Sequence, residues 1–287
     1  MTAAQFHFLV LVGLLSVCQA QQGPYGYVWR DTFADLSNWV LADEDGAATG
    51  NNEWEYYTSR PENVFLQANG AEGSQLVLQA QAESYNGYSY TSGKVYSQQM
   101  FGPYGFFNVR ATVPKGNCLW PAIWLLPINS TPYGTWAACG EIDFMETICE
   151  DPSAYSTLHF GGPWPNNVEA PANNVFPMTV DWSQPHNFGV EWQPTYIRFW
   201  FDSEVVNGNI VGESFNEVTS DQWYSMNAQG VHYPGTAPFD SPFNIVLNVA
   251  LGGGWPNSVE GCCSSVAVPA QMVVDFVEVW EIVLSES

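Results

Sequence analysis

The stretch CGEIDFMETICE, residues 139–150, carries acidic residues in a run that otherwise has the composition of a buried β-strand. Side chains alternate along a strand, so Glu141 and Asp143 share a face, whereas Glu146 would point to the opposite face. One inserted residue, a β-bulge, brings Glu146 back to the face of the other two, and bulges are common beside active sites. We therefore predict a bulged strand with three carboxyl groups on one side and apolar residues packed behind them.

A cluster of three carboxyl groups raises the pKa of its members and is costly unless it is used. Calcium would need six to eight oxygen ligands, which carboxylates on one strand face do not supply. A retaining glycosidase uses two carboxyl groups about 5 Å apart, one as nucleophile and one as general acid and then base. Glu141 and Glu146 would form such a pair, and Asp143 would hold a proton or hydrogen bond that keeps their pKa values apart. From spacing alone, an exposed acidic strand without chemistry is an equal alternative.

Tryptophans surround the acidic stretch in the sequence. In LWPAIWLLP, residues 119–127, Trp120 and Trp124 share one strand face, and Trp136 precedes Glu141 by five residues. Indole faces can stack on the apolar faces of pyranose rings, and aromatic side chains commonly line ligand sites. Burial of these indoles in the core is the alternative interpretation.

The composition narrows the class of ligand. The chain has only 6 Lys and Arg against 29 Asp and Glu, a net charge of -23, and 13 Trp among 15% aromatic residues. Binding to nucleic acid, anionic membranes or sulfated polymers needs cationic groups, so these partners are disfavoured. We expect a neutral, ring-shaped ligand.

The first residues resemble a secretory leader. Residues 6–17 are apolar except His7 and Ser16, and small residues end the run at Ala20. We predict a signal peptide at residues 1–20, and an exported, extracellular protein in which residues 21–287 form one domain. No later segment has the 18 consecutive apolar residues of a membrane span.

Cysteines outside the leader are odd in number. Export favours disulfides, but at least one thiol must stay unpaired within the chain, and the sequence leaves the pairing open. The five residues are Cys118, Cys139, Cys149, Cys262 and Cys263.

Short β-branched and aromatic runs between turn signals indicate an all-β protein, most simply a two-sheet β-sandwich. We expect residues 272–282 to form the last strand, paired with residues 27–32. A helix is expected only around residues 214–224, and the Pro- and Asn-rich residues 163–175 are expected to form a loop. Other expected strands are residues 75–80, 106–113, 188–192, 196–201 and 244–249.

Several motifs in one order resemble glycoside hydrolase family 16 in its laminarinase-like branch, over residues 28–281. They are NNEWEYYTSRPENVF, YGFFNVRATVPKGNCLWPAIWLLP, ACGEIDFMET, STLHFGG and NVALGGGWPN. The resemblance implies a β-jelly roll with a concave substrate cleft and an endo-acting retaining hydrolase of β-1,3-glucan or mixed-linkage glucan. It makes Glu141 the nucleophile, Asp143 its helper and Glu146 the acid/base, with no cofactor in catalysis.

The resemblance also implies roles for residues around the acids. Trp120 and Trp136 match sugar-stacking tryptophans, His159 matches a histidine that faces the catalytic acids, and Asn52 and Trp255 belong to motifs at the rim of the cleft. Each has a structural alternative, since a lone histidine or tryptophan is often a packed residue.

Three other positions follow from the family pattern or from a local motif. Asp275 matches an acid that helps to bind a structural calcium ion in many relatives, with simple solvent exposure as the alternative. Lys94 stands where an Arg is frequent, which removes a bidentate donor. Asn129 begins an N-glycosylation sequon.

Alternative functions keep the same fold. The chain could be a secreted glucan-binding recognition protein, a hydrolase of another polysaccharide such as a sulfated galactan, or a transglycosylase. We expect a monomer that binds neutral β-glucan and neither nucleic acid nor membrane.

Overall fold

The structure is a computed structural model that describes residues 23–69, 73–128, 132–171, 175 and 180–283. The predicted signal peptide at residues 1–20 and the sequon at Asn129 lie outside these residues. Within the described part of the chain, no helix is long and apolar enough to span a membrane.

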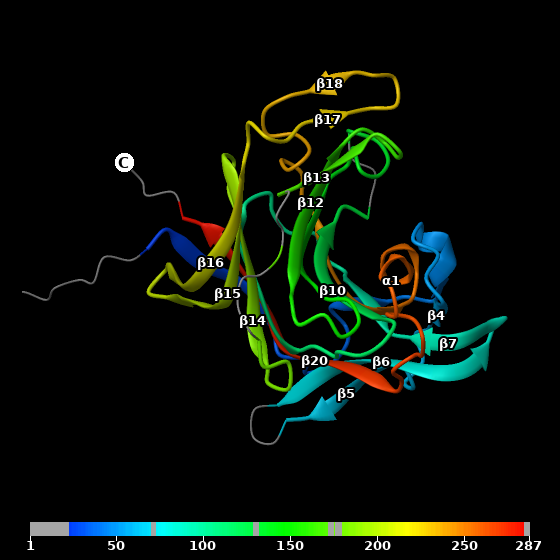
Figure 1. Ribbon diagram of the computed structural model, residues 1–287. Helices are drawn as coiled ribbons and strands as arrows, with labels where there is room; N and C mark the ends of the chain where they lie inside the picture. Colours follow the sequence, from blue (N-terminus) through cyan, green and yellow to red (C-terminus); the bar gives the residue numbers. More distant parts are fainter. Residues whose placement is uncertain (1–22, 70–72, 129–131, 172–174, 176–179, 284–287) are drawn as a thin grey trace, which may run out of the picture.

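Two sheets make up almost all of the fold, as predicted (Figure 1). The larger sheet has eleven strands, and β1 and β5 join it beside β20 and β6. Its strands, in spatial order and then the two additions, are β16 (Asn209–Thr219), β15 (Tyr196–Val206), β14 (His186–Trp192), β9 (Gly105–Thr112), β20 (Ala270–Ile282), β6 (Ser74–Tyr85), β7 (Tyr88–Ser92), β4 (Glu55–Tyr57), β3 (Glu44–Asp45), β1 (Tyr25–Asp31) and β5 (Val64–Ala68).

The second sheet has nine strands and carries the acidic stretch. β13 (Asn167–Ala170) pairs with β12 outside the main order. The main order is β18 (His232–Tyr233), β17 (Ser225–Met226), β12 (Tyr155–Gly161), β11 (Glu141–Glu146), β10 (Leu119–Leu126), β19 (Asn244–Leu251), β8 (Lys94–Ser97) and β2 (Trp39–Leu41). The only helical elements among the described residues are η1 (Gly46–Thr49) and α1 (Gly254–Ser258).

The core lies between the two sheets, where β10 and β12 face β14 and β15 (Figure 1). The first and last strands, β1 and β20, pair antiparallel as expected. Both sheets share one cluster of buried side chains, and the single domain over residues 21–287 stays a prediction. The members of this cluster include Leu78, Val109, Val190, Phe199, Val277, Ile123, Ile142, Leu158, Phe160 and Leu247.

Two local predictions were wrong. Residues 214–224 do not form a helix, because β16 pairs antiparallel with β15 and buries Val218 against the core. Asn207 and Gly208 both have positive φ in the two-residue connection, the signature of a tight hairpin turn, which outweighs local helix preference. The segment 163–175 is also not all loop, since it contains β13.

Two disulfides select one of the pairings that the sequence left open. Cys118 pairs with Cys263, and Cys149 pairs with Cys262, while Cys139 is a buried free thiol. The two adjacent cysteines thus fasten the segment after α1 to the chain before β10 and to the chain after β11. The bridges close loops of 145 and 113 residues in sequence separation.

Removing one bridge should destabilise the protein, because a crosslink restricts the unfolded chain. We expect the Cys149→Ser, Cys262→Ser double variant to lose about 2–5 kcal/mol of unfolding free energy. Urea denaturation of the variant, of the oxidised wild type and of the reduced wild type measures the difference. An unchanged midpoint in both the variant and the reduced protein would contradict the assignment.

Candidate active site

The acidic strand β11 is bulged, as predicted. Along β12, Asp143 pairs with Thr157 and Glu146 with Tyr155, so three steps on β11 match two steps on its neighbour. The register with β10 shifts at the same place, between Asp143 and Met145, which makes Phe144 the extra residue. The inserted residue returns Glu146 to the face of Glu141 and Asp143. Ile142, Phe144 and Met145 are all buried in the core behind them.

Each glutamate accepts a hydrogen bond from an indole N–H. Trp136 Nε1 donates to Glu141 Oε2 at 3.0 Å, and Trp120 Nε1 donates to Glu146 Oε1 at 2.9 Å. The side chain of Glu141 keeps 14% of its accessible surface, whereas Asp143 between the two glutamates keeps 5%. The two predicted catalytic glutamates are therefore oriented by separate donors, with a nearly buried carboxyl group between them.

His159 faces the acids from β12, directly opposite Glu141. Its Nε2 lies 3.2 Å from Asp143 Oδ2 and 3.8 Å from Glu141 Oε1, and Nδ1 lies 3.7 Å from Glu169 Oε1. One ligand atom from each of Glu141, Asp143 and His159 falls within 4.8 Å of the others. The histidine thus belongs to the acid cluster, as the sequence comparison with the family predicted.

Burial governs the protonation of the cluster. It is the largest cause that raises the pKa of Glu141, Asp143 and Glu146. The indole N–H groups and His159 act in the opposite direction on the two glutamates, because they stabilise the carboxylate form. On Asp143, by contrast, the charges of Glu146 and Glu169 raise the pKa further. The charges of Asp143 and Glu146 likewise raise the pKa of Glu141, so Glu141 and Asp143 both have pKa values well above that of an ordinary carboxyl group.

Aromatic side chains flank both glutamates. Beside Glu146, the ring of Trp120 meets Trp255 of α1 edge-on at 5.7 Å, and Trp255 meets Tyr155 at 4.9 Å. Beside Glu141, the ring of Trp136 lies 5.5 Å from the imidazole of His159. Trp120, Trp136 and Trp255 are partly accessible rather than core residues, so these predicted substrate contacts lie around the acids. Their binding role stays a prediction.

Sequence reasoning missed a hydrogen-bonded chain that approaches the acids from β4. Tyr57 donates to Glu53 Oε2 at 2.8 Å and accepts from Asn248 Nδ2 at 3.1 Å. Asn248 in turn accepts from Trp124 Nε1 at 2.8 Å, and Trp124 pairs with Asp143 across β10 and β11. No sequence signal joins these residues, since Tyr57 and Asn248 are 191 positions apart.

Asn52 is exposed and directly precedes Glu53, the first residue of this hydrogen-bonded series. It lines an open hollow of about 440 Å³ together with Trp54, Tyr88 and Tyr90. Trp54 packs so closely on Gly252 that a side chain there would overlap the indole. None of the three acids of β11 lines this hollow, and a substrate contact of Asn52 stays a prediction.

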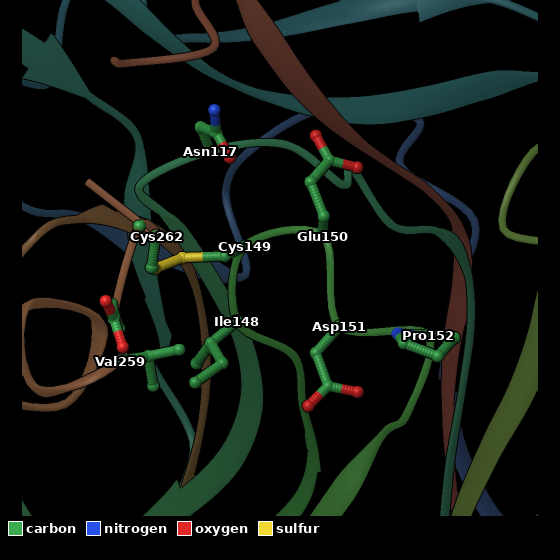
Figure 2. Close-up of a pocket in the computed structure, with 10 residues that line it drawn as sticks. Asn117, Ile148, Cys149, Glu150, Asp151, Pro152, Val259 and Cys262 are labelled. Atoms are coloured by element: carbon green, nitrogen blue, oxygen red, sulfur yellow. A yellow bond between two sulfur atoms is a disulfide. The ribbon is translucent and has the colours of Figure 1, made fainter. Parts of the chain in front are cut away.

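A larger hollow of about 540 Å³ lies beyond the C-terminal end of β11, and none of the three acids lines it (Figure 2). The Cys149–Cys262 disulfide forms part of its wall, and Glu150 and Asp151 stand nearby (Figure 2). The same disulfide packs with Ile148 against Trp120 and Trp255. This hollow therefore lies beside the disulfide that packs against Trp120, the donor to Glu146, and not at the acids themselves.

The surroundings of Asp275 do not fit the predicted calcium ion. Arg110 Nε lies 3.0 Å from Asp275 Oδ2, and the amide nitrogen of Gln75 donates to Oδ1. Both carboxyl oxygens face nitrogen donors, and a guanidinium repels a cation. Calcium requires a shell of oxygen ligands instead.

The family model of glycosyl hydrolases family 16 matches residues 50–241. The chain belongs to this family. It is 34% identical to Glucan endo-1,3-beta-glucosidase A1 of Niallia circulans, over 88% of this chain and 37% of that protein's length. It is 31% identical to the Beta-glucanase of Rhodothermus marinus, over 98% of this chain and 94% of the relative.

The fold agrees with this membership of family 16. The X-ray structure of the laminarinase from Rhodothermus marinus superposes with a TM-score of 0.72 and 28% identity, covering 91% of this chain and 98% of the other. The jelly-roll sandwich of the family is therefore the fold of this chain. Family 16 enzymes are glycoside hydrolases. The two-carboxyl chemistry expected of β11 is the usual chemistry of such hydrolases.

The pKa of Asp143 makes stability depend on pH. Between the ordinary and the raised value, the folded protein holds a proton that the unfolded chain releases, so unfolding free energy falls as pH rises through this window. Asp143→Asn removes this titration and should raise the Tm at neutral pH by a few degrees, at about 2–4 °C per kcal/mol for a domain of this size. Thermal unfolding at acidic and neutral pH measures both slopes.

The control is Asp35→Asn, because Asp35 is exposed and a hydrogen bond from Ser37 lowers its pKa. Its removal should not raise the Tm at neutral pH. If Asp143→Asn is no more stable than wild type at neutral pH, burial does not hold the proton on this carboxyl group.

Proposed function

We propose that this chain is an endo-acting retaining glycosidase that hydrolyses β-1,3-glucan of the laminarin type or mixed-linkage glucan. The observation that carries the proposal is the bulge of β11, which sets Glu141 and Glu146 on one face with an indole N–H on each. The names of the relatives support the substrate class. The concave cleft itself stays a prediction.

In the proposed mechanism, Glu141 is the nucleophile and Glu146 the acid/base. The Glu141 carboxylate attacks the anomeric carbon, while Glu146 gives its proton to the oxygen of the leaving sugar, so the glycosidic bond breaks as the glycosyl-enzyme ester forms. Glu146 then takes a proton from water, whose oxygen attacks the same carbon and releases Glu141. Two displacements at one carbon retain the anomeric configuration.

Asp143 serves this mechanism by staying protonated. Three adjacent carboxylates cannot all be charged in a buried site, and the charges of Glu146 and Glu169 add to burial in raising the pKa of Asp143. A neutral Asp143 removes one of the charges that raise the pKa of Glu141, and Trp136 and His159 both lower this pKa. Asp143 therefore acts as a positioning residue that separates the pKa values of the two glutamates.

The distribution of cations supports a neutral glycan. All six Lys and Arg residues are described, and each has an acidic or carbonyl partner within the chain. Lys94, on the sheet that carries the acids, lies 3.0 Å from Glu44 Oε1. A sulfated galactan would need free cationic side chains. The other pairs are Arg30 with Glu278, Arg60 with Glu83, Arg110 with Asp275, Lys115 with the Asp151 carbonyl, and Arg198 with Glu191 and Glu217.

The remaining proposals concern the location of the protein and its partners. The apolar run at residues 6–17 supports export through a leader at residues 1–20, and the two disulfides suit an oxidising, extracellular environment. A monomer without nucleic-acid or membrane partners accords with the net charge of -23.

A side-by-side assay tests the proposed activity. The wild type should release reducing ends from laminarin, and from lichenan if mixed linkages are accepted, but not from agarose. Glu141→Gln should reduce the rate by about 10³-fold or more, because an amide is not a nucleophile here. Product sizes that fall through intermediate lengths identify endo cleavage.

The matched control is Glu150→Gln, which removes an exposed acid just after β11 and should retain wild-type activity. A wild type that binds laminarin without releasing reducing ends at any pH would replace the proposal with the alternative of a glucan-binding protein. Longer products from an oligosaccharide donor would instead identify a transglycosylase.

The raised pKa values predict the pH dependence of kcat/KM. Activity needs Glu141 ionised and Glu146 protonated, so the acidic and basic limbs should both lie above the ordinary range of a glutamate. The Trp120 N–H lowers the pKa of Glu146, so Trp120→Phe should move the basic limb to higher pH while keeping an aromatic ring. Initial rates on soluble laminarin across pH measure this shift, and an unmoved basic limb would contradict the acid/base assignment.

A further inference from the structure

Trp164 is the most exposed of the large apolar side chains that the structure describes. It keeps 71% of its accessible surface and follows β12 on the short connection to β13. An exposed indole leaves a large apolar face in water, which is unfavourable unless a ligand covers it.

The position of Trp164 is fixed by backbone hydrogen bonds. Its N–H donates to the carbonyl of Trp136 at 3.1 Å. The turn that carries it is closed from Asn166 N to Pro163 O at 2.9 Å and from Gly162 N to Asn166 O at 3.0 Å. The backbone that carries the exposed indole is therefore held in place.

Trp164 continues the aromatic surface that begins at the acids. Its ring lies 6.4 Å from that of Trp136 with an angle of 32° between the planes. Trp136 lies 5.5 Å from the ring of His159 and donates to Glu141. The rings of His159, Trp136 and Trp164 thus form a series that begins beside the proposed nucleophile and ends at the exposed Trp164.

We propose that Trp164 forms a further glycosyl-binding position, next to the one at Trp136, for another ring of the same β-glucan chain. The inference rests on the proposed function and extends it. The apolar face of a pyranose would cover the indole, and the amide side chains of Asn166 and Asn167 on the same turn are suited to sugar hydroxyls. Residues 162–170 contain no Lys or Arg, so the position suits a neutral sugar.

Chain-length dependence tests this position. KM and kcat are measured on laminari-oligosaccharides of increasing length with wild type, Trp164→Ala and Trp164→Phe. For oligosaccharides long enough to reach Trp164, the alanine variant should raise KM about tenfold, which corresponds to the loss of one buried apolar face. Short oligosaccharides should show unchanged kinetics, and the phenylalanine variant should retain most of the affinity.

Tyr27→Ala is the matched control. Tyr27 is 58% exposed, and its ring also contacts an indole, that of Trp280 at 5.4 Å, but on the other sheet. This variant should behave as wild type at every length. Equal KM values for wild type and Trp164→Ala on the longest substrates, or the same loss at all lengths, would overturn the proposal.

A binding measurement separates this inference from the proposed activity. Calorimetric titration of a long laminari-oligosaccharide compares Glu141→Gln with the Glu141→Gln, Trp164→Ala double variant, and needs no turnover. Weaker binding by the double variant supports the position even if the wild type releases no reducing ends. Equal binding by both overturns it even if the enzyme is active.

Discussion

The structure depends on keeping three carboxyl groups together on one strand with little access to water. Burial and mutual repulsion both oppose their charges, so the group is tolerated only with a reduced charge and with donors for the carboxylates that remain. The bulge at Phe144 creates this problem by turning Glu146 to the side of Glu141. The indoles of Trp120 and Trp136 offset it, because each gives its N–H to one glutamate.

The two glutamates are supported in different ways. On the Glu146 side, Trp120 and Trp255 pack on a small cluster built around the Cys149–Cys262 disulfide, which ties the orientation of the proposed acid to covalent links. On the Glu141 side, Trp136 leads to exposed aromatic surface instead. A rigid support suits the group that must exchange a proton at a fixed distance, while the open side suits a polymer that extends past the cleavage point.

Local alternation was sufficient to predict the bulged strand, since Glu141, Asp143 and Glu146 can share a face only with one inserted residue. Family motifs placed His159, Trp120 and Trp136 around these acids. The β15–β16 hairpin was missed although Asn207 and Gly208 signal its turn. Disulfide pairing and the Tyr57–Asn248 contact could not be predicted, because they join positions more than 100 residues apart and depend on how the sheets pack.

The scarcity of cations has a chemical consequence beyond substrate choice. Each Lys and Arg is engaged by a partner within the chain, so the net charge of -23 is not balanced by mobile positive side chains near the acids. The resulting negative potential adds to burial in favouring the protonated form of a carboxyl group. A general acid that must keep its proton benefits from this field, whereas the nucleophile needs local donors against it. Trp136 and His159 act in that direction at Glu141, although burial still holds its pKa well above the ordinary value.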